Sequence, residues 1–119
     1  MSDAGYSLKI DNNIAILSVS GSLTSQEVVA FDDHLEKAME QSDKIILDFA
    51  ALEYMCSAAI GTLISYFNQT SEHGGTVIVA GVNSKMQKVL DVIGFPSIVE
   101  IVPSVAAAKK IIFDEDSSD

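Results

Sequence analysis

Residues 44–67 read KIILDFAALEYMCSAAIGTLISYF, and within this stretch the sequence changes from a strand pattern to a helix pattern. Its first part, residues 45–49, is short and almost continuously apolar, which is typical of a strand that is covered on both faces. Four apolar residues then follow at the i, i+3, i+4, i+7 spacing of one stripe of an amphipathic helix: Ile60, Leu63, Ile64 and Phe67. Ser57 lies where this helix is expected to begin.

A serine at the start of a helix has two interpretations. The first turn of a helix leaves backbone N–H groups without partners, and the aligned peptide dipoles make that end positive. Ser57 can therefore cap the helix with its hydroxyl, and its position alone favours this simpler interpretation. A phosphate group on Ser57 would also be well placed, because the amide donors already point toward it.

The segment before residue 44 predicts a hairpin and a helix. Residues 6–10 and 14–19 are two β-like runs joined by an Asp-Asn-Asn turn, and Gly21 is expected to end the second strand. Thr24 and Glu27 have the spacing of a capping box, which predicts a helix from residue 25 to about residue 41.

The segment after residue 56 continues the alternation of helices and strands. The apolar spacing and the glycine and proline positions predict helices at residues 57–72, 84–93 and 104–113 and strands at 76–82 and 98–102. A strand, a helix and another strand in this order predict a parallel pair joined by a right-handed crossover. The expected fold is an α/β domain over residues 1–113, in which a mixed β-sheet opened by a hairpin packs against about four helices. Residues 114–119 are expected to be an acidic, disordered tail.

The composition narrows the classes of function. The chain has 119 residues and a net charge of −10, so phosphate backbones and anionic membrane surfaces would repel it. No apolar run approaches the roughly 20 residues of a membrane span, and no secretory signal is visible at the N-terminus, so we expect a cytoplasmic protein. Its basic residues are all lysines. Without arginine, a phosphate on this chain is expected to act by repelling a partner rather than by docking within the domain.

The loop at residues 54–61, Tyr-Met-Cys-Ser-Ala-Ala-Ile-Gly, resembles the signature loop of the STAS family, which includes anti-sigma-factor antagonists and the tails of sulfate transporters. Ser57 falls on the serine that is phosphorylated in antagonists, and Gly61 falls on the final glycine of the pattern. Three residues depart from the pattern: Cys56 replaces an Asp, Ala58 a Ser or Thr, and Ala59 a Gly. Residues 21–24, 74–81 and 83–95 are similar to other segments of the family.

This resemblance implies a non-enzymatic switch protein without a cofactor or a metal. It would bind an anti-sigma factor serine kinase, which would phosphorylate Ser57, and a PP2C-type phosphatase would reverse the modification. The partner-binding surface that the resemblance implies comprises Ser22, Thr24, Met55, Cys56, Ser57, Ala58 and Gly61.

Two other functions stay open on the sequence. The loss of the Asp at Cys56 and of the second Ser or Thr at Ala58 favours a STAS scaffold or interaction subunit of a signalling or transport complex that works without phosphorylation. Alternatively, Cys56 beside a helix start could pair with His34 or His73 as a nucleophile, although no motif connects these residues. Asp48, near the end of a buried strand, is interpreted as a hydrogen-bonded strand-end carboxylate.

Overall fold

The computed structural model describes residues 4–116, and it confirms the predicted α/β fold with four helices and a mixed sheet opened by a hairpin. Short 3₁₀ turns lie at Ser25–Glu27 and Phe95–Ser97. The strands are β1 (Ala4–Asp11), β2 (Ile14–Leu23), β3 (Lys44–Asp48), β4 (Leu52–Met55), β5 (Thr76–Ala80) and β6 (Glu100–Val102). The helices are α1 (Val28–Gln41), α2 (Ser57–Glu72), α3 (Ser84–Val92) and α4 (Val105–Asp116).

The sheet has the strand order β1-β2-β3-β5-β6, and β4 pairs with the end of β2. β1 and β2 form the antiparallel hairpin, whereas β2–β3, β3–β5, β5–β6 and β2–β4 are parallel pairs. The hairpin turn places Asn12 and Asn13 at φ 52° and 67°. Asparagine tolerates this left-handed conformation better than most residues, which explains why the polar cluster turns the chain here.

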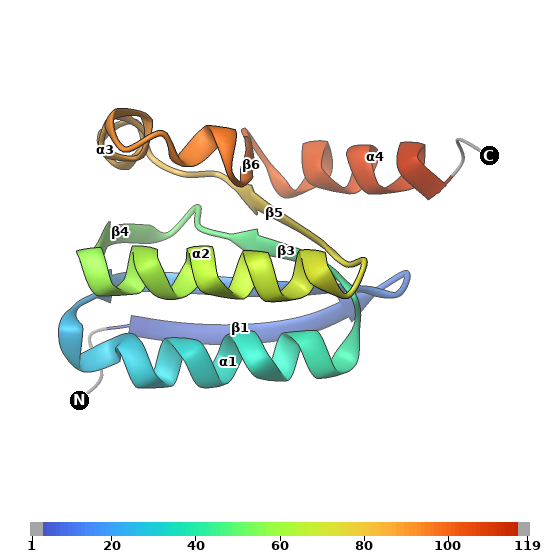
Figure 1. The fold of residues 1–119 in the computed structure, drawn as a ribbon, viewed down its shortest axis with the longest axis horizontal. Coiled ribbons are helices and arrows are strands. Elements are labelled where there is room, and N and C mark those ends of the chain that lie inside the picture. The colour runs from blue at the N-terminus through green and yellow to red at the C-terminus, as the bar shows by residue number, and fades with distance from the viewer. Residues whose placement is uncertain (1–3, 117–119) are drawn as a thin grey trace.

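Helices cover the two faces of the sheet unequally (Figure 1). The larger core lies on one face, where α1 and α2 pack side by side and α3 contributes Met86 and Leu90. The smaller core lies on the other face under α4, which contributes Ala108 and Ile112. Because the strands between these layers are covered on both sides, Ile45, Ile46 and Leu47 of β3 are all fully buried.

Two predictions about the N-terminal half need correction. Gly21 does not end β2, because it adopts a φ of 82° at a register shift and the strand continues to Leu23. The predicted helix from residue 25 begins as a 3₁₀ turn and becomes α-helical at Val28. Tighter 3₁₀ geometry is common in the first turn of a helix.

Differences also occur toward the C-terminus. The predicted last strand is shorter, since residues 98 and 99 belong to a turn and only Glu100–Val102 pair with β5. α4 continues to Asp116, so it includes three residues of the predicted acidic tail. The remaining tail residues, 117–119, lie outside the described part of the chain.

Candidate partner-binding surface

Ser57 is the first helical residue of α2 and is exposed. The N-cap is Cys56, which has an extended backbone (φ −74°, ψ 165°) and makes no side-chain cap hydrogen bond. The interpretation of Ser57 as the N-cap is therefore wrong by one residue. The helix ladder starts where the Ile60 N–H donates to the Cys56 carbonyl at 3.1 Å, so the amides of residues 57–59 precede the first intrahelical bond.

The pairing of β4 with β2 brings two distant parts of the predicted surface together. Ser22 lies opposite Tyr54 and Leu23 opposite Met55. The Cys56 N–H then donates to the Leu23 carbonyl at 2.9 Å, which holds the start of α2 against the end of β2. The segments that carry Ser22 and Ser57 are thus joined by backbone pairing.

The seven predicted surface residues differ in what they can offer a partner. Ser57, Ala58 and Gly61 are exposed, whereas Ser22, Thr24 and Cys56 are partly buried. Met55 is only 7 % exposed and packs into the larger core. Met55 therefore supports the loop from the core side. The Ser57 hydroxyl and the first exposed turn of α2 form the side of the loop that faces a partner.

A groove between α1 and α2 passes beside Gly61. It has a volume of about 500 Å³ and is lined by Val28, Val29, Asp32, Gly61, Thr62 and Ser65. A side-chain carbon at Gly61 would meet no atom within 4 Å, so local packing does not require glycine there. The empty space at Gly61 leaves room in the groove for a side chain from a partner.

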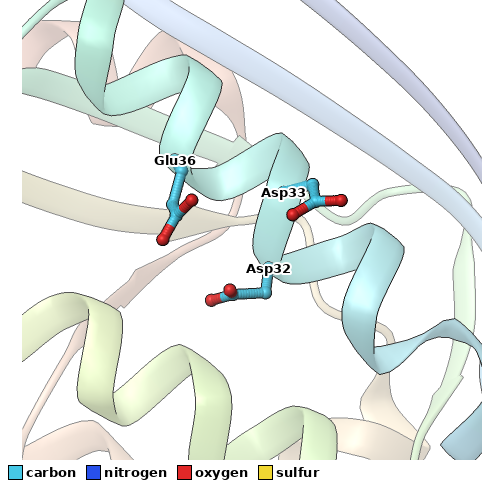
Figure 2. Close-up of side chains that lie close together, drawn as sticks. All are labelled: Asp32, Asp33 and Glu36. Carbon is cyan, nitrogen blue, oxygen red and sulfur yellow. The ribbon is translucent and has the colours of Figure 1, made fainter.

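Carboxylates make the α1 side of this groove acidic. Figure 2 shows Asp32 and Glu36 projecting from α1 toward the side on which α2 runs, whereas Asp33 projects from another side of α1. Of these three residues, Asp32 lines the groove itself. Oxygen atoms of these three residues lie within 4.8 Å of one another. Clustered acidic charge in water attracts basic groups of a partner and repels further negative charge.

A second groove lies on the other side of α2, between β4 and α3 (Figure 1), and sequence reasoning did not identify it. This β4–α3 groove has a volume of about 220 Å³. It is lined by Glu53, Tyr54, Met55, Ile60, Lys85, Met86, Val89 and Leu90. Val89 of α3 is 52 % exposed at the rim of this groove, whereas the neighbouring Leu90 is buried.

The proposed Cys–His nucleophile pair does not form in this fold. The ring of His34 stacks on Tyr6 with centroids 4.1 Å apart, and His73 lies at the far end of α2 with its Nδ1 2.8 Å from the Gln69 carbonyl oxygen. Burial and the nearby Lys37 ammonium lower the pKa of His34, so its ring is neutral over a wider pH range. Neither histidine is placed to activate Cys56.

Two further polar groups have structural roles. The Asp48 carboxylate accepts a hydrogen bond from the Ala50 N–H at 3.1 Å and from the Ser18 hydroxyl at 3.5 Å, which confirms a strand-end carboxylate held by hydrogen bonds. The Tyr6 hydroxyl donates to Oε1 of the buried Glu27 at 3.4 Å. Burial, together with the Glu27 charge, raises the pKa of Tyr6 to about 12, so the hydroxyl stays protonated and tethers β1 to the start of α1.

Comparison with known proteins identifies the family to which this chain belongs. The STAS domain model matches residues 6–108, and the chain therefore belongs to the STAS domain family. Among solved structures, an anti-sigma factor antagonist from Mycobacterium paratuberculosis is similar with a TM-score of 0.82 and 14 % identity, covering 91 % of this chain and 92 % of that one. The phosphorylated form of SpoIIAA, a Bacillus cell fate determinant, has a TM-score of 0.69 and 17 % identity, with 90 % and 99 % covered.

A transporter-related structure is also similar. A sulfate transporter family protein from Wolinella succinogenes has a TM-score of 0.72 and 14 % identity, covering 87 % of this chain and 91 % of that one. At these identities the likeness concerns the fold. Over residues 4–116, none of the helices combines the length and the apolarity that crossing a bilayer requires.

Proposed function

We propose that this chain is a cytoplasmic, non-enzymatic switch protein of the anti-sigma-factor-antagonist type, and that it binds an anti-sigma factor serine kinase. The observation that carries the proposal is the exposed Ser57 at the first helical position of α2, within a STAS fold. The binding surface consists of the end of β2 with Ser22 and Thr24, the loop before α2, and the first turns of α2 up to Gly61. Ser57 is the phosphoacceptor.

Phosphorylation would act on this surface by changing its charge. A phosphoserine carries about −1.5 to −2 charges at neutral pH. The added charge and bulk would fall on the exposed hydroxyl at the start of α2, inside the contact that the partner makes with the unmodified serine. A partner that complements the unmodified surface would then be repelled, and removal of the phosphate by a PP2C-type phosphatase would restore binding. The existence of a phosphorylated form of the structurally similar SpoIIAA supports this mechanism.

The direct test is an incubation with purified anti-sigma-type serine kinases from the same genome and ATP, followed by intact mass spectrometry and peptide mapping. The wild-type chain is expected to gain one phosphoryl group on Ser57. Ser57→Ala should gain none and still bind the kinase. Ser65→Ala, a matched serine two turns later on the exposed side of α2, should be modified like the wild type. Modification of a different residue would contradict the proposed role of Ser57.

A second candidate function is a STAS scaffold or interaction subunit of a signalling or transport complex that works without phosphorylation. The residues that favour it are Cys56, Ala58 and Ala59, which replace the Asp, the second hydroxyl and the glycine of the antagonist pattern. The similarity to a sulfate transporter family protein is compatible with it. Tight binding of a partner without any mass gain in the presence of ATP would favour the scaffold over the switch.

A further inference from the structure

The β4–α3 groove lies directly beside the residues that surround Ser57. Tyr54 and Met55 precede Ser57 on β4, Ile60 follows it in α2, and all three line the groove. We infer that the kinase partner inserts one aliphatic or aromatic side chain into this groove, with an acidic side chain next to it that faces Lys85. This inference rests on the proposed function, since it specifies the partner chemistry that the surface around Ser57 would accept.

The burial pattern marks the groove as a binding surface. Its bottom is core, because Met86 is 7 % and Leu90 2 % exposed. Its rim is apolar yet open to water, because Tyr54 is 51 % and Val89 52 % exposed. Single exposed apolar residues are common on protein surfaces, but an apolar rim around a hollow with an apolar bottom is typical of a contact surface.

The size of the groove favours a protein side chain over a drug-sized small molecule. Pockets that hold small-molecule ligands usually measure about 300–1,000 Å³. The β4–α3 groove, at about 220 Å³, is smaller than this range. It fits one large apolar side chain of the kind that anchors protein–protein interfaces, where a buried apolar group supplies much of the binding energy.

The charges on the two sides of α2 indicate how the partner would be oriented. On the α3 side, Lys85 lines the groove and Lys88 follows it on the exposed surface of the helix. Lys85 forms no ion pair with any of residues 4–116, and Glu53 occupies the opposite wall on β4. On the α1 side, the cluster of Asp32, Asp33 and Glu36 is acidic.

A complementary partner therefore presents an acidic group toward α3 and basic groups toward α1. Opposite charges at the two ends of one surface permit one orientation and disfavour the reverse, because reversal would bring like charges together. The apolar anchor lies between them and supplies affinity.

The test measures the affinity of the purified kinase for variants of the full chain by isothermal titration calorimetry. Val89→Asp places a charge on the rim and is expected to weaken binding by about tenfold or more. Val92→Asp is the matched control, because Val92 is on the same helix and 86 % exposed but does not line the groove. It should change the affinity by no more than about twofold. Lys85→Glu should weaken binding, and more so at low salt.

The possible results separate this inference from the proposed function. If Val89→Asp binds as tightly as Val92→Asp while Ser57→Asp is weakened, the groove is not contacted and only this inference is overturned. If no anti-sigma-type kinase of the genome binds the wild-type chain, the proposed function fails and the inference fails with it. An octanoate titration followed by NMR tests the small-molecule alternative. If octanoate shifts the NMR signals of the Val89 and Leu90 methyl groups saturably and the kinase does not shift them, the inference that a partner side chain occupies the groove is overturned.

Discussion

Gly74 and Gly75 follow α2 and provide a pair of neighbouring substitutions whose costs differ in origin. Gly75 lies where chain segments approach closely: an added side-chain carbon would be 2.6 Å from the Thr70 methyl carbon and 2.7 Å from the Asp43 carbonyl oxygen. Gly74 has a φ of +79° but no atom within 4 Å of such a carbon. Gly75→Ala thus meets a steric clash with the backbone, whereas Gly74→Ala meets only conformational strain.

The magnitudes follow from these two environments. The clash at Gly75 cannot be relieved by a small backbone shift, because its N–H donates to the Thr70 carbonyl at 2.9 Å and the next N–H donates to the Asp43 carbonyl at 2.8 Å. Overpacking costs typically about 1–3 kcal/mol. Loss of one of these hydrogen bonds adds roughly 0.5–1.5 kcal/mol. We therefore expect Gly75→Ala to destabilise the domain by about 2–4 kcal/mol, against about 1–2 kcal/mol for Gly74→Ala.

Urea denaturation followed by circular dichroism measures the loss of stability in both variants. The comparison requires that the free energy of unfolding depends on urea concentration with the same slope in each variant. A domain of this kind has about 5–15 kcal/mol of stability, so both variants are expected to stay folded without urea. The reasoning is refuted if Gly75→Ala loses no more stability than Gly74→Ala. In that case the close approach of the α2–β5 connection to the end of α1 would tolerate a methyl group.

Three further predictions concern charge, a buried hydroxyl and pH. Ser57→Asp should weaken kinase binding by about 1 kcal/mol or more, less than phosphoserine because it adds a single charge; affinity equal to that of the wild type would contradict repulsion as the mechanism. The Tyr66 hydroxyl is buried without a hydrogen-bond partner within residues 4–116, so Tyr66→Phe should raise the free energy of unfolding by about 1 kcal/mol in urea titrations; a loss would show that the hydroxyl is satisfied. The Lys109 ammonium binds Asp11 and lowers the pKa of that carboxyl, first through the hydrogen bond and then through its charge. A carboxyl whose pKa is lower in the folded than in the unfolded state stabilises the fold at pH values above the unfolded-state pKa. This stabilisation is lost as the pH falls through the folded-state pKa. The stability gap between wild type and Lys109→Gln should therefore shrink on acidification, and a gap that widens would reverse the sign.

Much of the fold could be predicted because it depends on residues close together in the sequence. The apolar run at residues 45–49 and the helical stripe from Ile60 to Phe67 predict a buried strand and a helix, and both are present. The turn at residues 11–13 joins two β-like runs, and the hairpin follows from it. In each case, side-chain periodicity and turn chemistry act over a few residues, which a single sequence displays directly.

The candidate site could be predicted only in part. Ser57 was located at the start of α2 from the change in periodicity, and the structure places it one residue inside the helix. β4 was missed because it has four residues and two of them, Glu53 and Tyr54, are exposed, so no alternation reveals it. Its pairing with β2 continues past Gly21, which has a positive φ, and skips Glu53 between the Gly21–Leu52 and Ser22–Tyr54 pairs.

The sequence by itself determined the alternation of strands and helices, the acidic charge, and the presence of a serine where α2 begins. Only the tertiary structure decided which segments surround that serine. Backbone pairing of β4 with β2 brings Ser22 beside Tyr54, and packing of α3 forms the apolar groove with its lysine. The physical reason is that periodicity reports which face of an element is apolar, whereas contacts between distant segments depend on how those faces pack in three dimensions.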